Sequence, residues 1–323
     1  MAKKGRCYSG IGGQAVLEGV MMRNNDKYAV AVRKPDGNIS VNVENYTGAA
    51  TEKKVKKIPF VRGVVNFVDS LMLGTKVLNF STSFYEEEEE DSRLDRFLKK
   101  LLGENAEKLM TGFVTVLSVA MAVGLFILLP YFICSLFEDY LHNRSLVLII
   151  EGCIRICIFL LYATGISLMK DIRRLYQYHG AEHKCINCIE RGKPLTVNYV
   201  RRSSRLHKRC GTSFIFFVMV VSIILFFFIR VDVIWQRALL RILLLPVVAG
   251  ISYELIRLAG RSDNILVRIL SAPGMLIQRL TTKEPDDDMI EVAIASVEAV
   301  FDWKAYLKEN FGYADEVLGT DEK

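Results

Sequence analysis

The stretch GFVTVLSVAMAVGLFILLPYFICSLF, residues 112–137, contains no charged side chain and determines the class of fold. A helix needs about 20 consecutive apolar residues to cross a bilayer, and this stretch exceeds that length. Residues 213–229 are likewise uncharged and rich in Phe, Ile and Val. Residues 145–169 and 238–258 are apolar except for a few charged side chains: Glu151, Arg155, Arg241, Glu254 and Arg257. We therefore predict a predominantly α membrane protein with four transmembrane helices in residues 111–260.

The distribution of basic residues predicts which helix ends face the cytosol. The loop 170–212 contains eleven Lys or Arg and three acids, whereas residues 138–144 contain one basic residue and residues 230–237 contain two. Positively charged loops stay on the cytoplasmic side of a membrane. We therefore predict a multi-pass protein of the cell membrane, with both termini and the 170–212 loop in the cytosol.

Residues 1–58 are predicted to form a small cytosolic β-rich unit. Tyr28–Val32 and Ile39–Val43 flank Pro35-Asp36-Gly37, which is a favourable turn sequence. The glycine-rich residues 10–23 lack the spacing of a dinucleotide-binding loop. We expect their glycines to serve turns and close packing rather than phosphate binding.

Three further segments complete the predicted organisation. Residues 59–84 have apolar side chains at the helical period, but Arg62 and Asp69 interrupt them, which favours an amphipathic interfacial helix over a fifth span. An acidic linker and helix are expected at residues 85–110. Residues 261–323 are expected to form a cytosolic C-terminal segment.

The net charge of +6 fits a protein whose basic residues lie near a membrane. Anionic lipids attract such residues, so the bilayer and its anionic lipids are the expected partners, and a membrane-protein partner is compatible with the same surface. Nucleic acid is not expected, because the basic residues are not interleaved with aromatic stacking partners. Of the seven cysteines, Cys134, Cys153 and Cys157 fall within or at the end of predicted spans, and the other four are predicted to lie in the cytosol, where we expect no disulfides. The sequence does not indicate an oligomeric state.

The sequence His179-Gly-Ala-Glu-His183 brings three ionisable side chains into one helical turn. Residues four apart lie on the same helix face, so His179 and His183 are within reach of one metal ion. Glu182 is placed to take a proton from a metal-bound water. The pattern H-x-x-E-H is that of the inverted zinc peptidases. These residues predict a metal site, with zinc as the expected ion and Glu182 as its catalytic base.

Further metal ligands are available in the same loop, which contains three of the four histidines of the chain. His207 and Cys210 are three apart, and imidazole and thiolate both suit zinc. Cys188 is five residues from His183 and is an additional candidate ligand. An alternative is a closed structural zinc site with four ligands, which are Cys185, Cys188, His207 and Cys210. The alternative interpretation of the whole cluster is that these histidines are ordinary surface residues on a basic loop and form no metal site.

Charged residues in the apolar segments are also candidates for function, because charges are costly in lipid. Glu151 and Arg155 are four apart, and we expect them to form an internal salt bridge. Glu254 lies near the cytosolic end of the predicted fourth span, where it is a candidate ligand or proton acceptor. Arg205 and Arg209, beside His207, are candidates for binding an anionic substrate or a developing negative charge.

These motifs resemble a bacterial membrane family, the YqhQ-like proteins, which is of unknown function and is described as predicted metal-dependent enzymes. The stretches that carry the resemblance are spread over most of the chain: Gly12–Arg23, Tyr178–Lys184, Asn187–Cys188, Ser204–Gly211 and Leu280–Pro285. The resemblance implies a membrane protein and adds weight to Glu18, an acid inside the first motif.

Two functions compete on this basis. The first is a metal-dependent hydrolase that acts on a lipid, a peptide or a membrane protein at the cytosolic interface. The second is a non-enzymatic membrane scaffold or assembly factor whose structural metal fixes the 170–212 loop. A transporter is disfavoured, because the spans lack paired Gly or Pro interruptions in equivalent halves.

Overall fold

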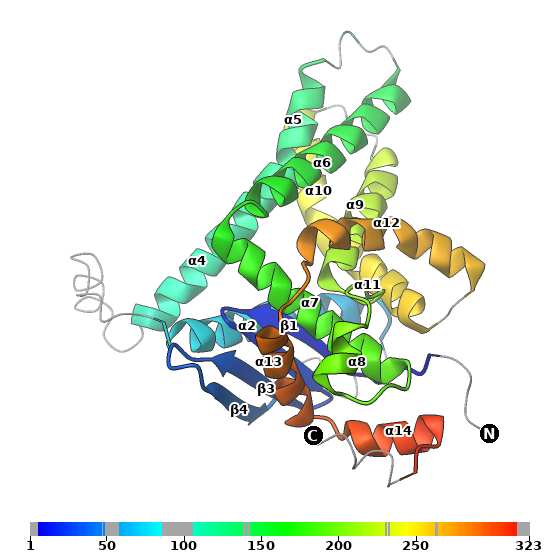
Figure 1. Ribbon diagram of the computed structural model, residues 1–323. Coiled ribbons are helices and arrows are strands. Elements are labelled where there is room, and N and C mark those ends of the chain that lie inside the picture. Colours follow the sequence, from blue (N-terminus) through cyan, green and yellow to red (C-terminus); the bar gives the residue numbers. More distant parts are fainter. Residues whose placement is uncertain are drawn as a thin grey trace. The chain divides into compact units, whose positions relative to one another are not determined.

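The structure is a computed structural model (Figure 1) that describes residues 6–46, 48, 58–85, 106–137, 140, 143–229, 231, 233–261 and 264–314. The chain divides into two compact units. The first unit comprises Met1–Phe84, Ala163–Val218 and Ala249–Lys323, and the second comprises Tyr85–Tyr162 and Met219–Val248. Most of the acidic linker predicted at 85–110 lies outside the described residues.

The N-terminal part of the first unit is a four-stranded antiparallel sheet in the order β1-β2-β3-β4. Its strands are β1 (Gly12–Val16), β2 (Gly19–Asn24), β3 (Lys27–Arg33) and β4 (Ile39–Asn45). The turn at Pro35-Asp36-Gly37 joins β3 and β4 as predicted, and Gly37 has a φ of 87° that favours glycine. The glycine-rich residues form the hairpin β1–β2, so they contribute strands as well as turns.

Helices cover both faces of this sheet. Because side chains alternate along a strand, Val20, Met22 and Ala31 share one face, and they pack in one core with α7 (Lys170–Glu190) and α13 (Asp287–Glu298). On the other face, Nζ of Lys76 in α2 (Val61–Thr82) lies 5.7 Å from the ring centroid of Tyr28. The sheet is therefore the middle of three layers.

Helix α2 follows the period predicted for residues 59–84. It buries Leu73 and Val77, whereas Phe67, Leu71 and Met72 remain exposed. This exposed apolar face is consistent with an interfacial helix, and its contact with a membrane stays a prediction.

The remaining elements of the first unit are helical. They are α8 (Val197–Arg201), the first part of α9 (Gly211–Phe227), most of α11 (Leu245–Arg261), α12 (Ile265–Thr281) and α14 (Trp303–Phe311). Side chains of Asp286 and Asp302 accept hydrogen bonds from backbone N–H groups at the starts of α13 and α14, which fixes where these helices begin. The region predicted as a basic loop, residues 170–212, thus contains the helices α7 and α8.

The second unit consists of apolar helices. Helix α4 (Ala106–Val123), the π-helical η3 (Gly124–Leu128) and α5 (Leu129–Ser135) follow one another directly, and Leu109–Ser135 is the part of this long helix that could span a membrane. The unit also contains most of α6 (Arg144–Ile166), the second part of α9, and α10 (Ile234–Leu243). Glu151, Arg155 and Arg241 are buried among these helices.

Among the described residues, two or three segments could span a membrane by length and composition. Leu109–Ser135 and Ser145–Ile166 are each long and apolar enough to cross a bilayer, and α10 and α11 form a bent pair that could make a third span. Helix α9, the predicted third span, has only 17 residues. The predicted fourth span is interrupted at Leu244, just before Pro246. Four spans therefore stay a prediction.

Two glycines permit the close approaches that bring distant segments to α7. A Cβ on Gly180 would lie 2.1 Å from the carbonyl oxygen of Lys283, so only glycine lets the segment after α12 pass beside α7. A Cβ on Gly13 would lie 2.6 Å from the carbonyl oxygen of Met21 and 2.9 Å from Cγ of Glu182. The close packing expected of the N-terminal glycines is therefore present at Gly13.

We expect Gly180→Ala to lower the free energy of unfolding by about 1–3 kcal/mol, because the added methyl group displaces a backbone carbonyl rather than a flexible side chain. Gly165→Ala is the matched control, since its Cβ would meet no atom within 4 Å and alanine favours a helix. Thermal unfolding of both variants in detergent checks this. Equal unfolding temperatures would contradict the packing role of Gly180.

Candidate metal centre

Helix α7 carries the residues at the centre of the site. Its last three turns are buried, including Glu182 and His183. His179, Glu182 and His183 lie on one face because they are three and four residues apart. The ring centroids of His179 and His183 are 4.4 Å apart.

The two imidazole rings are held by main-chain carbonyls from distant segments. Nδ1 of His179 lies 2.9 Å from the carbonyl oxygen of Thr281 at the end of α12, and Nδ1 of His183 lies 2.6 Å from that of Arg205. A carbonyl can only accept, so each Nδ1 carries the proton when neutral. This leaves the Nε2 lone pairs available, which is the usual arrangement of a metal-binding histidine and its hydrogen-bonded neighbour.

Cys210 completes a group of three candidate ligands. One ligand atom from each of His179, His183 and Cys210 lies within 4.8 Å of the others. The Cys210 Sγ is 3.1 Å from Nε2 of His179. Two imidazoles and a thiolate are suitable ligands for zinc. The structure thus brings together three of the four predicted metal ligands.

The charges in this group favour a thiolate. Burial raises the pKa of Cys210, but the adjacent His179 and His183 outweigh it and hold that pKa well below its usual range. Burial lowers the pKa of His179, but the neighbouring Cys210 outweighs this effect and raises it to about 9. The thiolate is the form of cysteine that binds metals. The metal-free site therefore favours a thiolate–imidazolium pair, whose imidazolium proton a metal would replace.

Glu182 lies beside the group of three candidate ligands. Its Oε2 is 3.9 Å from Nε2 of His179, and its side chain is buried. Burial raises the pKa of this carboxyl, although His183 and His179 oppose the rise and a backbone hydrogen bond with Gly13 lowers it. The predicted catalytic base is therefore next to the candidate metal ligands, against strand β1.

His207 is placed differently from the prediction. Its Nε2 lies 3.5 Å from Oε2 of Glu190, and its backbone N–H donates to Oε1 of Gln278. Burial lowers its pKa to about 4. Between the predicted alternatives of His207 and Cys210 as third ligand, the geometry favours Cys210.

Glu190 is a buried acid that the sequence analysis did not select. It accepts hydrogen bonds from Arg6, Ser9 and Arg209. Burial raises its pKa, but the hydrogen bond with His207 and the charges of Arg209 and Arg6 outweigh burial and hold the pKa well below its usual range. A signal was present in the sequence, because Glu190 is one of only three acids in the basic stretch 170–212.

The other predicted site residues have separate partners. Cys188 contacts the carbonyl oxygens of Lys193 and Pro194, and burial raises its pKa to about 11. Glu254 pairs with Arg62 of α2. Arg205 donates to the carbonyl of Thr282.

Glu18 and Arg209, the last two predicted site residues, form ion pairs within the first unit. Glu18 pairs with Arg174 and accepts a hydrogen bond from Tyr178 Oη at 3.2 Å. Arg209 pairs with Glu190 and stacks on the ring of Tyr8 at 3.8 Å. Both arginines proposed to bind substrate anions are therefore already in contact with protein groups.

The fold and the site define a mainly helical protein with apolar helices and a buried His-His-Cys group. The model of the family described as "Protein of unknown function (DUF1385)" matches residues 58–303. A relative from Bacillus subtilis (strain 168), named "Uncharacterized protein YqhQ", is 38% identical over 301 residues, which cover 93% of this chain and 94% of the relative. The chain belongs to this YqhQ-like DUF1385 family. No solved structure matches the chain significantly.

We expect the purified protein to contain about one zinc ion per chain, and His179→Ala, His183→Ala and Cys210→Ser to lose it because each removes one of three ligands. His207→Ala is the matched control and should retain the ion. Metal content by mass spectrometry checks this. Loss of zinc in His207→Ala but not in Cys210→Ser would contradict the ligand set.

We expect Glu190→Gln to lower the free energy of unfolding by about 3 kcal/mol near neutral pH, because it leaves the partly buried guanidinium groups of Arg6 and Arg209 without their buried partner. Glu190 has a lowered pKa, so its contribution is present above the usual value of 4.5 and is lost as the pH falls below it.

Denaturant unfolding of wild type and Glu190→Gln across this pH range checks the prediction, and the difference should shrink on acidification. Glu291→Gln removes the exposed pair with Arg33 and should change stability by less than about 1 kcal/mol. A Glu190→Gln difference that does not depend on pH would contradict the assignment of charge.

Proposed function

We propose that this protein is a metal-dependent hydrolase, in which His179, His183 and Cys210 bind one zinc ion and Glu182 is the general base. The observation that carries the proposal is the convergence of three ligand atoms within 4.8 Å, with the other ring nitrogen of each histidine fixed by a carbonyl. Three protein ligands leave one position open on a tetrahedral ion, as in catalytic zinc sites.

The residues around the ligands have separate roles in this mechanism. A zinc ion held by these residues would make a bound water acidic enough to ionise near neutral pH. Glu182, 3.9 Å from Nε2 of His179, accepts the proton of the attacking water and returns it to the leaving group. The Gly13 backbone holds the Glu182 carboxylate by a hydrogen bond, so the N-terminal glycine motif orients the base.

The apolar helices support a substrate at a membrane. Two helices, or three with the bent pair, could span a bilayer, and the basic stretch 170–212 contains α7. The distribution of charge supports a cytosolic location for this stretch, where its basic residues would attract anionic lipids. A lipid, a peptide or a membrane-protein segment that is reached from the cytosolic interface is the proposed substrate.

The second candidate function is a membrane scaffold with a structural metal, which the burial of the candidate ligands favours. His183 and Cys210 are 1% and 5% exposed. A metal there would join α7 to the segment before α9, stabilising a scaffold for a membrane-protein partner. A closed site has four protein ligands, whereas the catalytic site has an open position.

Cobalt substitution separates these two functions. In a catalytic site, an added anionic ligand such as azide occupies the open position and changes the visible absorption spectrum of the cobalt protein. In a closed structural site the spectrum stays unchanged. An unchanged spectrum would overturn the hydrolase and leave the structural metal.

We expect Glu182→Gln to retain the metal and to lower hydrolysis by about a hundredfold or more, because the amide keeps the shape of the side chain but cannot take a proton. The reaction is measured with a panel of ester, amide and phosphodiester substrates in vesicles. Glu291→Gln is the control for loss of a carboxylate elsewhere. Full activity of Glu182→Gln would remove Glu182 from the mechanism.

A further inference from the structure

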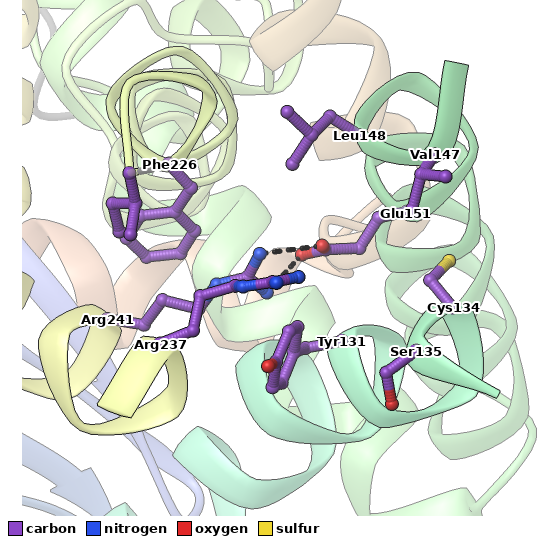
Figure 2. A pocket seen from close by; sticks show the side chains of 10 residues that line it. Tyr131, Cys134, Ser135, Val147, Leu148, Glu151, Phe226, Arg237 and Arg241 are labelled. Atoms are coloured by element: carbon purple, nitrogen blue, oxygen red, sulfur yellow. Dashed lines mark hydrogen bonds and ion pairs between the residues drawn. The ribbon is translucent and has the colours of Figure 1, made fainter. Parts of the chain in front are cut away.

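The exposure pattern of the second unit supports a lipid environment for its helices. Glu151 and Arg241 are 3% and 1% exposed, and in Figure 2 their side chains point toward one another, joined by a hydrogen bond of 2.6 Å. Large apolar side chains lie outside, and Phe113, Val116 and Leu161 are 67%, 69% and 73% exposed. Charges inside and apolar side chains outside suit the acyl chains of a bilayer and not water.

Helix α12 of the first unit packs against the protein by one polar face. Nε2 of Gln278 donates to the carbonyl oxygen of His207 and to Oγ of Ser213, each at 2.7 Å, and Oε1 of Gln278 accepts from the backbone N–H of His207 at 2.9 Å. A Cβ on Gly274, one turn earlier, would lie 3.1 Å from Oγ of Ser213. This face of α12 is therefore fixed by protein contacts.

The opposite face of α12 is an exposed apolar stripe, formed by Ile265, Ile269 and Leu276, which are 61%, 64% and 57% exposed. These residues are four and seven apart, so they follow one side of the helix. At about 100° per residue, that side is opposite Gly274 and Gln278. Water is an unfavourable environment for a stripe of large apolar side chains, which indicates that another apolar surface covers it.

Two arginines border the apolar stripe. Arg268 and Arg279 follow Ile265 and Leu276 by three residues, and both arginines are exposed. Residues three apart are neighbours on a helix surface, so each arginine lies beside the stripe. The sequence of α12 contains no acidic residue. An apolar face beside basic residues is typical of helices that lie in a membrane surface, where cations attract anionic lipids.

The position of α12 in the chain brings its start near a membrane surface. Ile234–Leu243 and Leu245–Gly260 are the bent pair that could be a broken span or a re-entrant loop, and in both cases its last residues return to a membrane surface. Helix α12 begins at Ile265, and the five residues from Gly260 reach at most about 18 Å. With 17 residues, two arginines and the buried Gln278, α12 is too short and too polar to cross the bilayer itself.

From the apolar stripe, the bordering arginines and the adjacent candidate span, we propose that α12 is an interfacial helix that binds the surface of a phospholipid bilayer. The apolar stripe lies among the acyl chains, and Arg268 and Arg279 attract the phosphates of anionic lipids. The polar face of the same helix stays against the protein. Residues 261–323, predicted as a cytosolic segment, thus begin with a membrane-bound helix.

This contact brings the membrane surface close to the candidate metal centre. The carbonyl oxygen of Thr281, at the end of α12, lies 2.9 Å from Nδ1 of His179, and Gln278 holds the backbone of His207. One helix therefore contacts both the bilayer and the segments that form the site. The membrane contact does not depend on the proposed hydrolase, because it requires neither a metal nor a reaction.

The experiment uses the full-length protein in vesicles of phosphatidylglycerol and phosphatidylcholine in equal amounts. The photoreactive residue p-benzoylphenylalanine replaces Ile269 or Leu276, one position per protein, and mass spectrometry identifies the products of irradiation. Leu161 of α6 is the reference position for contact with lipid, and Glu291 of α13 is the matched control for exposure outside the stripe. We expect phospholipid adducts at Ile269 and Leu276 with yields similar to that at Leu161, and none at Glu291.

The arginines are tested in the same assay. In the double variant Arg268→Gln and Arg279→Gln, we expect the Ile269 position to lose its preference for phosphatidylglycerol over phosphatidylcholine, because neutral side chains do not attract anionic lipids. Lys304→Gln, a change of an exposed cation on α14, is the control and should keep the preference. An unchanged preference in the double variant overturns the role of the arginines.

The products at the two stripe positions decide the membrane contact. Phospholipid adducts support it. A cross-linked dimer assigns the stripe to a second copy of the chain, and the absence of both products assigns it to water. Either of these results overturns the proposal. If one substituted protein does not fold, the other position gives the same test.

Discussion

Two hydrogen bonds from imidazole nitrogens to main-chain carbonyls are the constraint on which the candidate site depends. The carbonyls of Thr281 and Arg205 fix the proton on Nδ1 of His179 and His183, and thereby direct both Nε2 atoms toward Cys210. The Thr281 carbonyl lies two residues before Lys283, whose close approach to α7 requires glycine at position 180. A main-chain acceptor cannot rotate away as a side chain can, so the rings are preorganised for a ligand.

Two buried acids of this unit have pKa values shifted in opposite directions. Burial dominates at Glu182 and raises its pKa, whereas at Glu190 the hydrogen bond with His207 and the charges of Arg209 and Arg6 overcome burial and lower the pKa. The first carboxyl is therefore suited to proton transfer and the second to holding cations in place. Glu190 binds the N-terminal segment to the segment that precedes Cys210, so it supports the site without belonging to it.

The second unit illustrates the same principle in an apolar environment. The spacing of Glu151 and Arg155 predicts a neutral pair, and that pair is present. Arg241, ninety residues further along the chain, converts it into a positively charged cluster. Helical periodicity describes contacts within one helix, and it contains no information on which other helix supplies a third charge. Charge balance inside such a bundle is therefore a tertiary property.

The sequence by itself determined the local structure and the chemistry that is available. Charge-free runs determined the apolar helices, alternation and turn residues determined β3 and β4, and the spacing of His179, Glu182 and His183 determined one reactive helix face. Only the tertiary structure brought Cys210 to His179 and His183, placed His207 beside Glu190, turned Arg205 and Arg209 toward protein partners, and gave Cys188 and Glu254 other contacts. The reason is physical: local sequence fixes which side chains share a face, whereas convergence of remote segments is set by close packing and the need to pair buried polar groups.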